Sequence, residues 1–163
     1  MLRKLTVIAG VALAVAAVAG WALSASAGPS ASAGSSAASK TLKFLDHTAK
    51  GSYVDLADEG YSPGDEFVFH DVLRRGGKAV GTVDGFCKIT AARPVGFSAC
   101  AGTIKLPGGQ IEIQLGGRNI GGGRKPFSLG ITGGTGSYES SRGSGLVKPV
   151  SEQNSYVTLN LTI

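Results

Sequence analysis

The feature that most constrains this chain is an alternation of apolar and polar residues that recurs from Thr41 onward. Successive side chains of a strand point to opposite faces, so a period of two indicates one buried and one solvated face. No segment after residue 40 keeps a helical period for three turns. We therefore expect about eight short strands. They are marked by Leu42 and Phe44, Phe67 and Phe69, Val83 and Cys87, Cys100 and Ile104, Ile111 and Ile113, Phe127 and Leu129, Leu146, and Val157 and Leu159.

Residues typical of tight turns separate these segments, as at Ser62-Pro63-Gly64-Asp65, Arg75-Gly76-Gly77, Pro107-Gly108-Gly109 and Gly121-Gly122-Gly123. The 26 glycines, about double the average share, also disfavour a helical bundle. Short strands joined by tight turns predict an all-β fold, either an antiparallel barrel or a sandwich. A closed barrel would remove the exposed edges that an open sheet has to protect.

The first 27 residues have the three parts of a secretory signal peptide. A positive head, Met1 to Lys4, precedes an uncharged Ala/Val-rich run from Leu5 to Leu23, and the small residues Ala25-Ser26-Ala27 follow. We expect cleavage there and a secreted protein. The alternative is an uncleaved membrane anchor, because a run of 19 apolar residues can just span a bilayer.

Residues 28–39 contain only Gly, Pro, Ser and Ala, which predicts a disordered spacer before a barrel domain over residues 40–163. Without the leader, 14 Lys and Arg remain against 11 Asp and Glu, a net charge of +3 with no block of like charge. This composition argues against nucleic acid as a partner. The sequence has no His/carboxylate metal pattern, and no nucleophile elbow supports a hydrolase.

Cys87 and Cys100 bracket a loop-like segment, residues 92–96. A hairpin that turns there would set the two cysteines opposite each other, which in an exported chain predicts a disulfide. Closing a loop of this length stabilises a protein by about 3 kcal/mol. The alternative is a reactive thiol.

Four short motifs follow in a distinctive order: Gly64 to Phe69, Val80 to Cys87, Gly108 to Ile113, and Leu129 to Tyr138 with Arg142-Gly143 after it. The sequence from Thr41 to Ile163 thereby resembles the superfamily that joins plant allene oxide cyclases, dirigent proteins and their secreted bacterial relatives. The resemblance implies an eight-stranded antiparallel β-barrel with an apolar cavity, often assembled as a homotrimer. It also implies chemistry without a cofactor or a metal.

Asp71 lies between Phe69 and Leu73 on a predicted apolar face. A carboxylate there is costly unless it is paired or protonated, so we expect a raised pKa and a candidate catalytic residue. The alternatives are a bulge that rotates Asp71 outward and a structural pair with an arginine. By resemblance, this stretch matches a cyclase segment that carries an inward Asn holding a bound water, and here Asp replaces it.

Asp46 follows Leu42 and Phe44 in the same way, so it is the second candidate catalytic residue. Dirigent proteins carry an Asp near this place, thought to donate a proton to a quinone methide, and cyclases have a Glu nearby. Arg142 is the third candidate, because dirigent proteins have an inward Arg at this motif. It would neutralise an aspartate or hold a substrate oxyanion, or else lie on the surface.

Phe44, Phe67 and Phe69 are the candidate ligand-binding wall, and Tyr138 either packs the barrel end or contacts the ligand. His70 should point away from the face of Asp71, so the two form no dyad. We expect a barrel that binds a small hydrophobic molecule, as a cyclase or isomerase that fixes the stereochemistry of ring closure. The alternatives are a non-catalytic carrier, a dirigent-like protein working with a separate oxidase, and a structural barrel with a filled interior.

Overall fold

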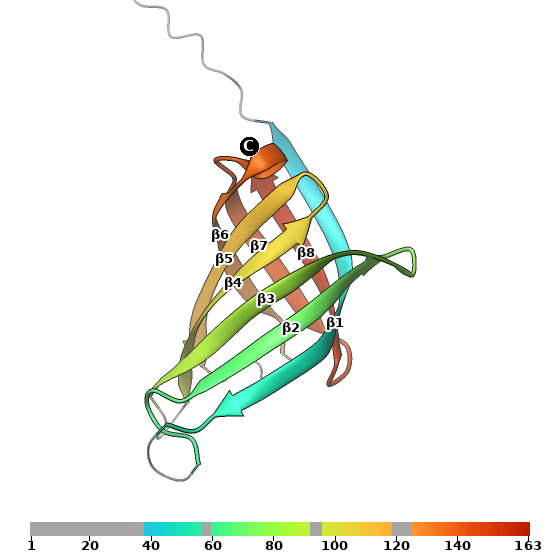
Figure 1. Ribbon diagram of the computed structural model, residues 1–163. Coiled ribbons are helices and arrows are strands. Elements are labelled where there is room, and N and C mark those ends of the chain that lie inside the picture. Colours follow the sequence, from blue (N-terminus) through green and yellow to red (C-terminus); the bar gives the residue numbers. More distant parts are fainter. Residues whose placement is uncertain (1–37, 57–59, 92–95, 119–124) are drawn as a thin grey trace, which may run out of the picture. The chain divides into compact units, whose positions relative to one another are not determined.

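The computed structural model describes residues 38–56, 60–91, 96–118 and 125–163, and the predicted leader and nearly all of the predicted spacer lie outside these ranges. The described residues form eight strands and one 3-10 helix (Figure 1). Among them, no helical segment has the length and apolar character that a membrane crossing requires. The elements are β1 (Ser39–Val54), β2 (Glu66–Arg75), β3 (Lys78–Ala91), β4 (Phe97–Leu106), β5 (Gly109–Arg118), β6 (Phe127–Gly134), η1 (Gly136–Tyr138), β7 (Arg142–Pro149) and β8 (Asn154–Thr162).

The strands form a closed antiparallel barrel in which each strand pairs with its neighbours in sequence and β1 pairs with β8. The β1–β8 seam runs from Ser39 opposite Thr162 to His47 opposite Asn154. Each described strand thus has a partner on both sides, although β5 and β6 pair only from Ile111 to Gln114. An open sheet of the same strands would expose two full edges. The barrel that the family resemblance implied is confirmed, and the sandwich alternative is wrong.

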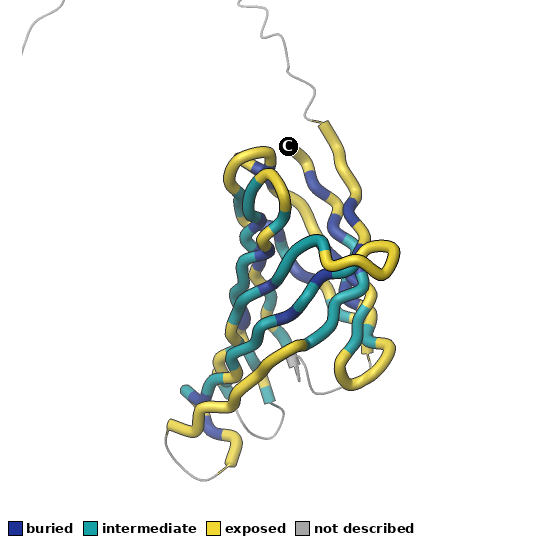
Figure 2. The backbone as a smooth tube through the Cα atoms, turned by 45° about the vertical axis from the view of Figure 1, so that its right-hand side comes forward, coloured by how far each residue is buried: buried dark blue, intermediate teal, exposed yellow. Residues whose placement is uncertain are grey.

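The period-two alternation of the sequence sorts the side chains between the barrel interior and the outer wall, and burial alternates along the strands accordingly (Figure 2). The interior is filled mainly by branched aliphatic side chains that every strand contributes. The buried apolar core consists of Leu42, Phe44, Leu73, Val83, Ile104, Ile111, Ile113, Leu129, Ile131, Tyr138, Val147, Val157, Leu159 and Leu161.

The two ends of the barrel interior differ in burial. At the end with the β2–β3, β4–β5 and β6–β7 connections, here called the buried end, Leu73 and Ile111 are 0% exposed, and Tyr138 of η1 belongs to the core. At the opposite end, here called the exposed end, Phe67 shares the inward face of β2 but is 41% exposed, and Phe69 is half-buried. Inward-facing side chains therefore remain within reach of solvent at the exposed end.

A disulfide joins Cys87 of β3 to Cys100 of β4, as the sequence predicted. The two residues lie directly opposite each other in the strand pairing, with their Cα atoms 4.0 Å apart. Cys87 also pairs with Phe67 of β2, so the bridge belongs to the interior wall near the exposed end. Of the predicted turn between the cysteines, residues 92–95 lie outside the described part of the chain.

Asp65 ties down the β1–β2 connection beside the exposed end. Its carboxylate accepts hydrogen bonds from the Tyr53 hydroxyl (2.5 Å), the Leu56 backbone N–H (3.0 Å), and both the backbone N–H (2.6 Å) and hydroxyl (3.0 Å) of Ser62. These donors, led by the Leu56 N–H, lower the pKa of Asp65 to about 2. The predicted turn Ser62-Pro63-Gly64-Asp65 is therefore held by its own last side chain.

Candidate active site

Asp46 and Asp71 both face the barrel interior from neighbouring strands. Asp46 lies opposite Leu73, and Asp71 lies opposite Thr48 in the β1–β2 pairing. This register makes the two aspartates diagonal neighbours on one face, a relation in which residues lie roughly 7–8 Å apart. Side chains at that spacing are within electrostatic reach of each other.

Regular strand geometry keeps both carboxyl groups inside. The pairing of β1 with β2 shifts beside Asp71, but the extra residue is Ala49 on β1, so β2 itself continues its alternation through Asp71. The pairing of β2 with β3 shifts only after Leu73. The alternation that begins with the buried Leu42 and Phe44 therefore continues unbroken to Asp46. The bulge considered as an alternative for Asp71 is not present.

Both carboxyl groups are shielded from solvent, and their hydrogen-bonding capacity is only partly satisfied. Asp71 is only 7% exposed, and the Oδ1 atoms of Asp46 and Asp71 are buried with no hydrogen-bond partner among the described residues. Burial, followed by the charge of Asp71, raises the pKa of Asp46 to about 7. Burial also raises the pKa of Asp71, although a hydrogen bond from Thr48 partly opposes the shift. The pair is therefore able to retain a proton near neutral pH.

Arg142 does not join this pair. It lies opposite Thr162 on the outer wall near the buried end, whereas Asp46 lies opposite Ser155 at the other end of β8. Its side chain is exposed, and its Nη1 donates a hydrogen bond of 2.8 Å to the Ser141 carbonyl. Arg142 therefore lies on the surface, which was the alternative, and does not point inward as the resemblance implied.

The candidate ligand-binding aromatic residues fall into two groups. The rings of Phe67 and Phe69 are stacked at the exposed end, with centroids 6.2 Å apart and an interplanar angle of 20°. Both share the inward face of β2 with Asp71. Phe44, by contrast, is 4% exposed and packs in the core, and Tyr138 packs at the buried end. Phe67 and Phe69 therefore lie on the strand that carries Asp71, whereas Phe44 and Tyr138 belong to the packed core.

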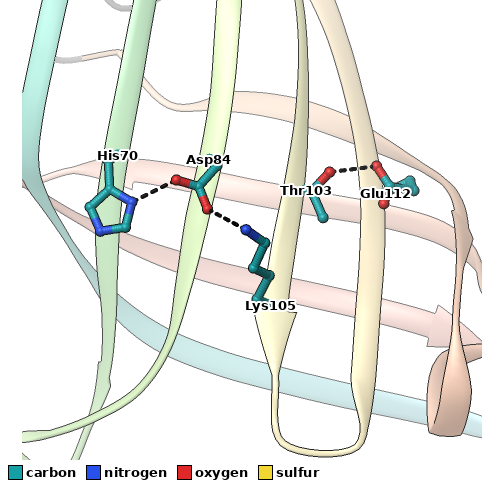
Figure 3. Close-up of polar contacts among 5 residues, drawn as sticks. All are labelled: His70, Asp84, Thr103, Lys105 and Glu112. Carbon is teal, nitrogen blue, oxygen red and sulfur yellow. Dashed lines mark hydrogen bonds and ion pairs between the residues drawn. The ribbon is translucent and has the colours of Figure 1, made fainter.

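His70 points to the outer wall, as expected, and takes part in a polar network there (Figure 3). Its Nδ1 lies 2.6 Å from Oδ1 of Asp84, and Nζ of Lys105 lies 3.1 Å from Oδ2 of the same carboxylate. The hydrogen bond with His70 is the main reason why the pKa of Asp84 is lowered. The described residues contain no group of three His, Cys, Asp or Glu side chains that could hold a metal ion.

Sequence reasoning did not single out Thr48 and Ser155, the polar residues opposite the two aspartates. Thr48 hydrogen-bonds Asp71, and Ser155 lies across the β1–β8 seam from Asp46. The inward position of Thr48 could have been predicted, because Leu42, Phe44, Asp46 and Thr48 follow one another at a spacing of two. Together these residues form a polar group at one side of an apolar interior, where a carboxyl of raised pKa can donate or accept a proton.

The model of the family described as allene oxide cyclase barrel like domain matches residues 46–161. No curated protein matches the sequence significantly. A solved structure of pyocyanin demethylase is 30% identical, with a TM-score of 0.68 over 76% of this chain and 100% of that chain.

Two further solved structures share the fold at lower identity. The Diels Alderase AbmU from Streptomyces koyangensis is 17% identical, with a TM-score of 0.61 over 76% of this chain and 64% of that chain. A pterocarpan synthase dirigent protein is 17% identical, with a TM-score of 0.59 over 76% of this chain and 88% of that chain.

Proposed function

Because this chain belongs to the family of allene oxide cyclase barrel like domains, we propose that it binds a small, largely apolar molecule at the exposed end and acts on it through Asp46 and Asp71. The observation that carries the proposal is the carboxyl pair, in which each Oδ1 is buried without a partner inside an apolar wall. Buried polar atoms in native proteins are nearly always hydrogen-bonded, and the exceptions require an explanation. A bound ligand that supplies the missing partners is that explanation.

The two aspartates would have different roles in such a reaction. Asp46, with its pKa raised to about 7, is suited to proton transfer at neutral pH, where an ordinary aspartate is a weak base and holds no proton to donate. Asp71, hydrogen-bonded by Thr48, would stabilise positive charge that develops on the bound molecule. Phe67 and Phe69 would hold that molecule in one orientation.

The first candidate reaction is cyclisation or isomerisation within one molecule. Confinement in a rigid barrel would select one conformation for ring closure, and a nearby carboxyl would move the proton. The family match over residues 46–161 favours this candidate. A non-catalytic carrier, or a dirigent-like partner of a separate oxidase, would use the same residues only for binding.

The second candidate is demethylation of a planar N-methylated aromatic molecule such as pyocyanin, in which water takes up the methyl carbon as formaldehyde and the ring system accepts the two electrons. The observation in its favour is the 30% identity to pyocyanin demethylase, which this chain matches over that protein's whole length. The stacked rings of Phe67 and Phe69 fit a planar ligand, because aromatic faces pack well in offset stacks.

We also propose that the protein acts outside the cytoplasm, since disulfides such as Cys87–Cys100 persist mainly in oxidising compartments. Cell fractionation with detection of the cleaved form tests this proposal. The homotrimer implied by the resemblance stays a prediction, which light scattering of the purified protein checks.

The test of the function compares wild type with Asp46→Asn, Asp71→Asn and the outer-wall control Asp84→Asn. Binding and turnover are measured with pyocyanin and with a panel of conjugated polyenes and epoxides, by spectroscopy and mass analysis of products. We expect turnover of one probe, reduced about 100-fold or more in the first two variants because general acid–base groups contribute 10²–10⁴-fold. Asp84→Asn should match wild type.

The outcomes separate the candidates. A demethylated product supports the second candidate, and a rearranged isomer of unchanged mass supports the first. Binding without turnover of any probe would identify a carrier and contradict an enzyme. No binding by wild type, or equal turnover in all variants, would contradict the proposed role of the carboxyl pair.

A further inference from the structure

We propose that the molecule bound beside Asp46 and Asp71 carries a positive charge, as a protonated amine, an iminium or an N-alkylated heteroaromatic cation. The inference rests on the proposed function and adds the charge class of the ligand. It follows from what surrounds the two carboxyl groups and from where the cationic side chains of the barrel lie.

The described cation nearest the pair on the inward face of β2 is Arg75, which lies on the other side of Leu73 from Asp71. Its guanidinium lies over the ring of Phe44 and its Nε donates a hydrogen bond to the Lys43 carbonyl, so it is not paired with either carboxylate. Both aspartates face inward, and, apart from each other, the described residues directly beside them on the adjacent strands are polar but uncharged, or apolar. Those facing Asp46 are Leu73 and Asp71 from β2 and Ser155 and Val157 from β8, and those facing Asp71 are Asp46 and Thr48 from β1 and Val83 and Gly85 from β3.

Two cationic side chains of β1 and β2 contact aromatic rings of the core. Nζ of Lys40 lies 5.1 Å from the ring centroid of Tyr138 at the buried end, and the guanidinium of Arg75 lies 4.9 Å from the ring of Phe44. Both residues lie toward the buried end of the barrel.

The two histidines near the pair belong to the outer wall. His47 Nδ1 lies 3.1 Å from Asn154 Oδ1, and His70 contacts Asp84. Burial has the largest effect on the pKa of Asp71 and raises it above its ordinary value. The hydrogen bond from Thr48 and the charges of His70 and His47 oppose this shift, and Asp84 adds to it. Among the described residues, no cationic side chain forms an ion pair with Asp46 or Asp71.

Two carboxylates in an apolar surrounding cannot both ionise readily without a neighbouring positive charge. A neutral ligand would leave one of them protonated or uncompensated. A cation would interact favourably with both unpartnered Oδ1 atoms and would favour the doubly ionised pair. The rings of Phe67 and Phe69, on the same face of β2, would add cation–π attraction for a flat cation.

This arrangement couples binding to proton release. Because Asp46 has a pKa of about 7, a cation binding at pH 6 has to displace its proton, whereas at pH 8 the carboxylate is already present. Affinity for a permanent cation should therefore rise with pH by up to about tenfold per unit below pH 7 and level off above it. Affinity for a neutral molecule of the same shape should not rise in this way.

The experiment uses two tricyclic probes of nearly equal shape, the N-methylphenazinium cation and uncharged phenazine. Binding to the full-length protein is measured by calorimetry from pH 5 to 8, in buffers of different ionisation enthalpy that report proton release. We expect the cation to bind at least tenfold more tightly than phenazine at pH 8, with the preference shrinking toward pH 5. Asp71→Asn and Asp46→Asn/Asp71→Asn should lose the preference while still binding phenazine, and Asp84→Asn should retain it.

Each outcome decides a separate question. Phenazine binding as tightly as the cation at pH 8 would overturn the charge inference and leave the proposed small-molecule site standing. A cation preference that survives in the double variant would also overturn it, because the cation would then bind elsewhere. Failure of both probes to bind wild type would overturn the inference together with the proposed site for planar ligands. Circular dichroism and thermal unfolding confirm that the variants are folded.

Discussion

The ring of Phe69 occupies the space in front of Gly85, its direct partner across the β2–β3 pairing. A Cβ atom on Gly85 would lie 2.6 Å from Cζ of that ring and 2.7 Å from the carbonyl oxygen of Ala101. The missing side chain of Gly85 therefore allows Phe69 its position, two residues before Asp71 on the same strand. The shape of the interior beside the carboxyl pair depends on this contact.

Gly85→Ala should displace Phe69 and weaken ligand binding, and it should reduce the free energy of unfolding by about 1–3 kcal/mol because the backbone oxygen cannot yield as a side chain can. The matched control is Gly116→Ala on the outer face, where the nearest atom, the Ser98 carbonyl oxygen, lies 3.7 Å from the new Cβ. Urea unfolding and probe binding measure both effects. Equal behaviour of the two variants would contradict the role given to Gly85.

Asp46→Asn should change how stability depends on pH. The pKa of Asp46 is raised from 3.8 to about 7 on folding, so the native state binds a proton that the unfolded chain releases between these values. Stability of the wild type therefore falls as pH rises from 4 to 7. The variant lacks this loss, so its stability relative to wild type should grow across that range, by at most about 4 kcal/mol at 1.36 kcal/mol per pKa unit.

The measurement is denaturant unfolding of both proteins at pH 4, 6 and 8. A stability difference that stays constant over these three values would show that Asp46 titrates normally in the native state. Asp84→Asn, on the exposed outer wall, serves as the reference for a substitution of the same chemistry, and an effect below about 1 kcal/mol is expected for it.

Asp65→Asn should show the opposite pH dependence. Hydrogen bonds lower the pKa of Asp65 to about 2, so its contribution to stability is present above pH 4 and is lost as pH falls toward 2. The variant should unfold several degrees lower than wild type at pH 7, and the gap should narrow below pH 4. Thermal unfolding at pH 7, 4 and 2.5 checks this, and a gap that widens in acid would refute it.

Replacing both Cys87 and Cys100 by Ala should lower the free energy of unfolding by about 3 kcal/mol, since the bridge closes a short loop in the unfolded chain. Reduction of wild type should produce a similar loss and should leave the double variant unchanged. Guanidinium unfolding with and without reductant provides the comparison. If reduction destabilised the double variant as well, the effect would not come from this disulfide.

Much of this architecture could be predicted from the alternation of residues. It placed Asp46 and Asp71 on inward faces, because each follows apolar residues at a spacing of two, and it set Cys87 opposite Cys100 through the symmetry of one hairpin. Alternation predicts whether a side chain points inward or outward, but not where along the barrel axis it lies. Phe44 and Phe67 were therefore grouped in one wall, although Phe44 packs in the core and Phe67 is at the exposed end.

The orientation of Arg142 and the contact of His70 with Asp84 could not be predicted either, for other reasons. Arg142 is followed by Gly143, Ser144 and Gly145, which provide no apolar alternation to show which face the strand buries. The face of β7 is decided further along, where Val147 packs into the core and places Arg142 outside. The contact of His70 with Asp84 depends on the register between two strands, and register follows from the shifts and turns of the folded hairpin.

The seam between β1 and β8 joins segments that are far apart in the sequence, with Ala38 and Ile163 exchanging backbone hydrogen bonds of 3.0 and 2.9 Å. Each of the other strand pairs joins neighbours in sequence and can form once the second strand has been synthesised. The β1–β8 pair cannot form before β8 has been synthesised. Until β8 is available, the sheet therefore stays open, with β1 as one of its unpaired edges.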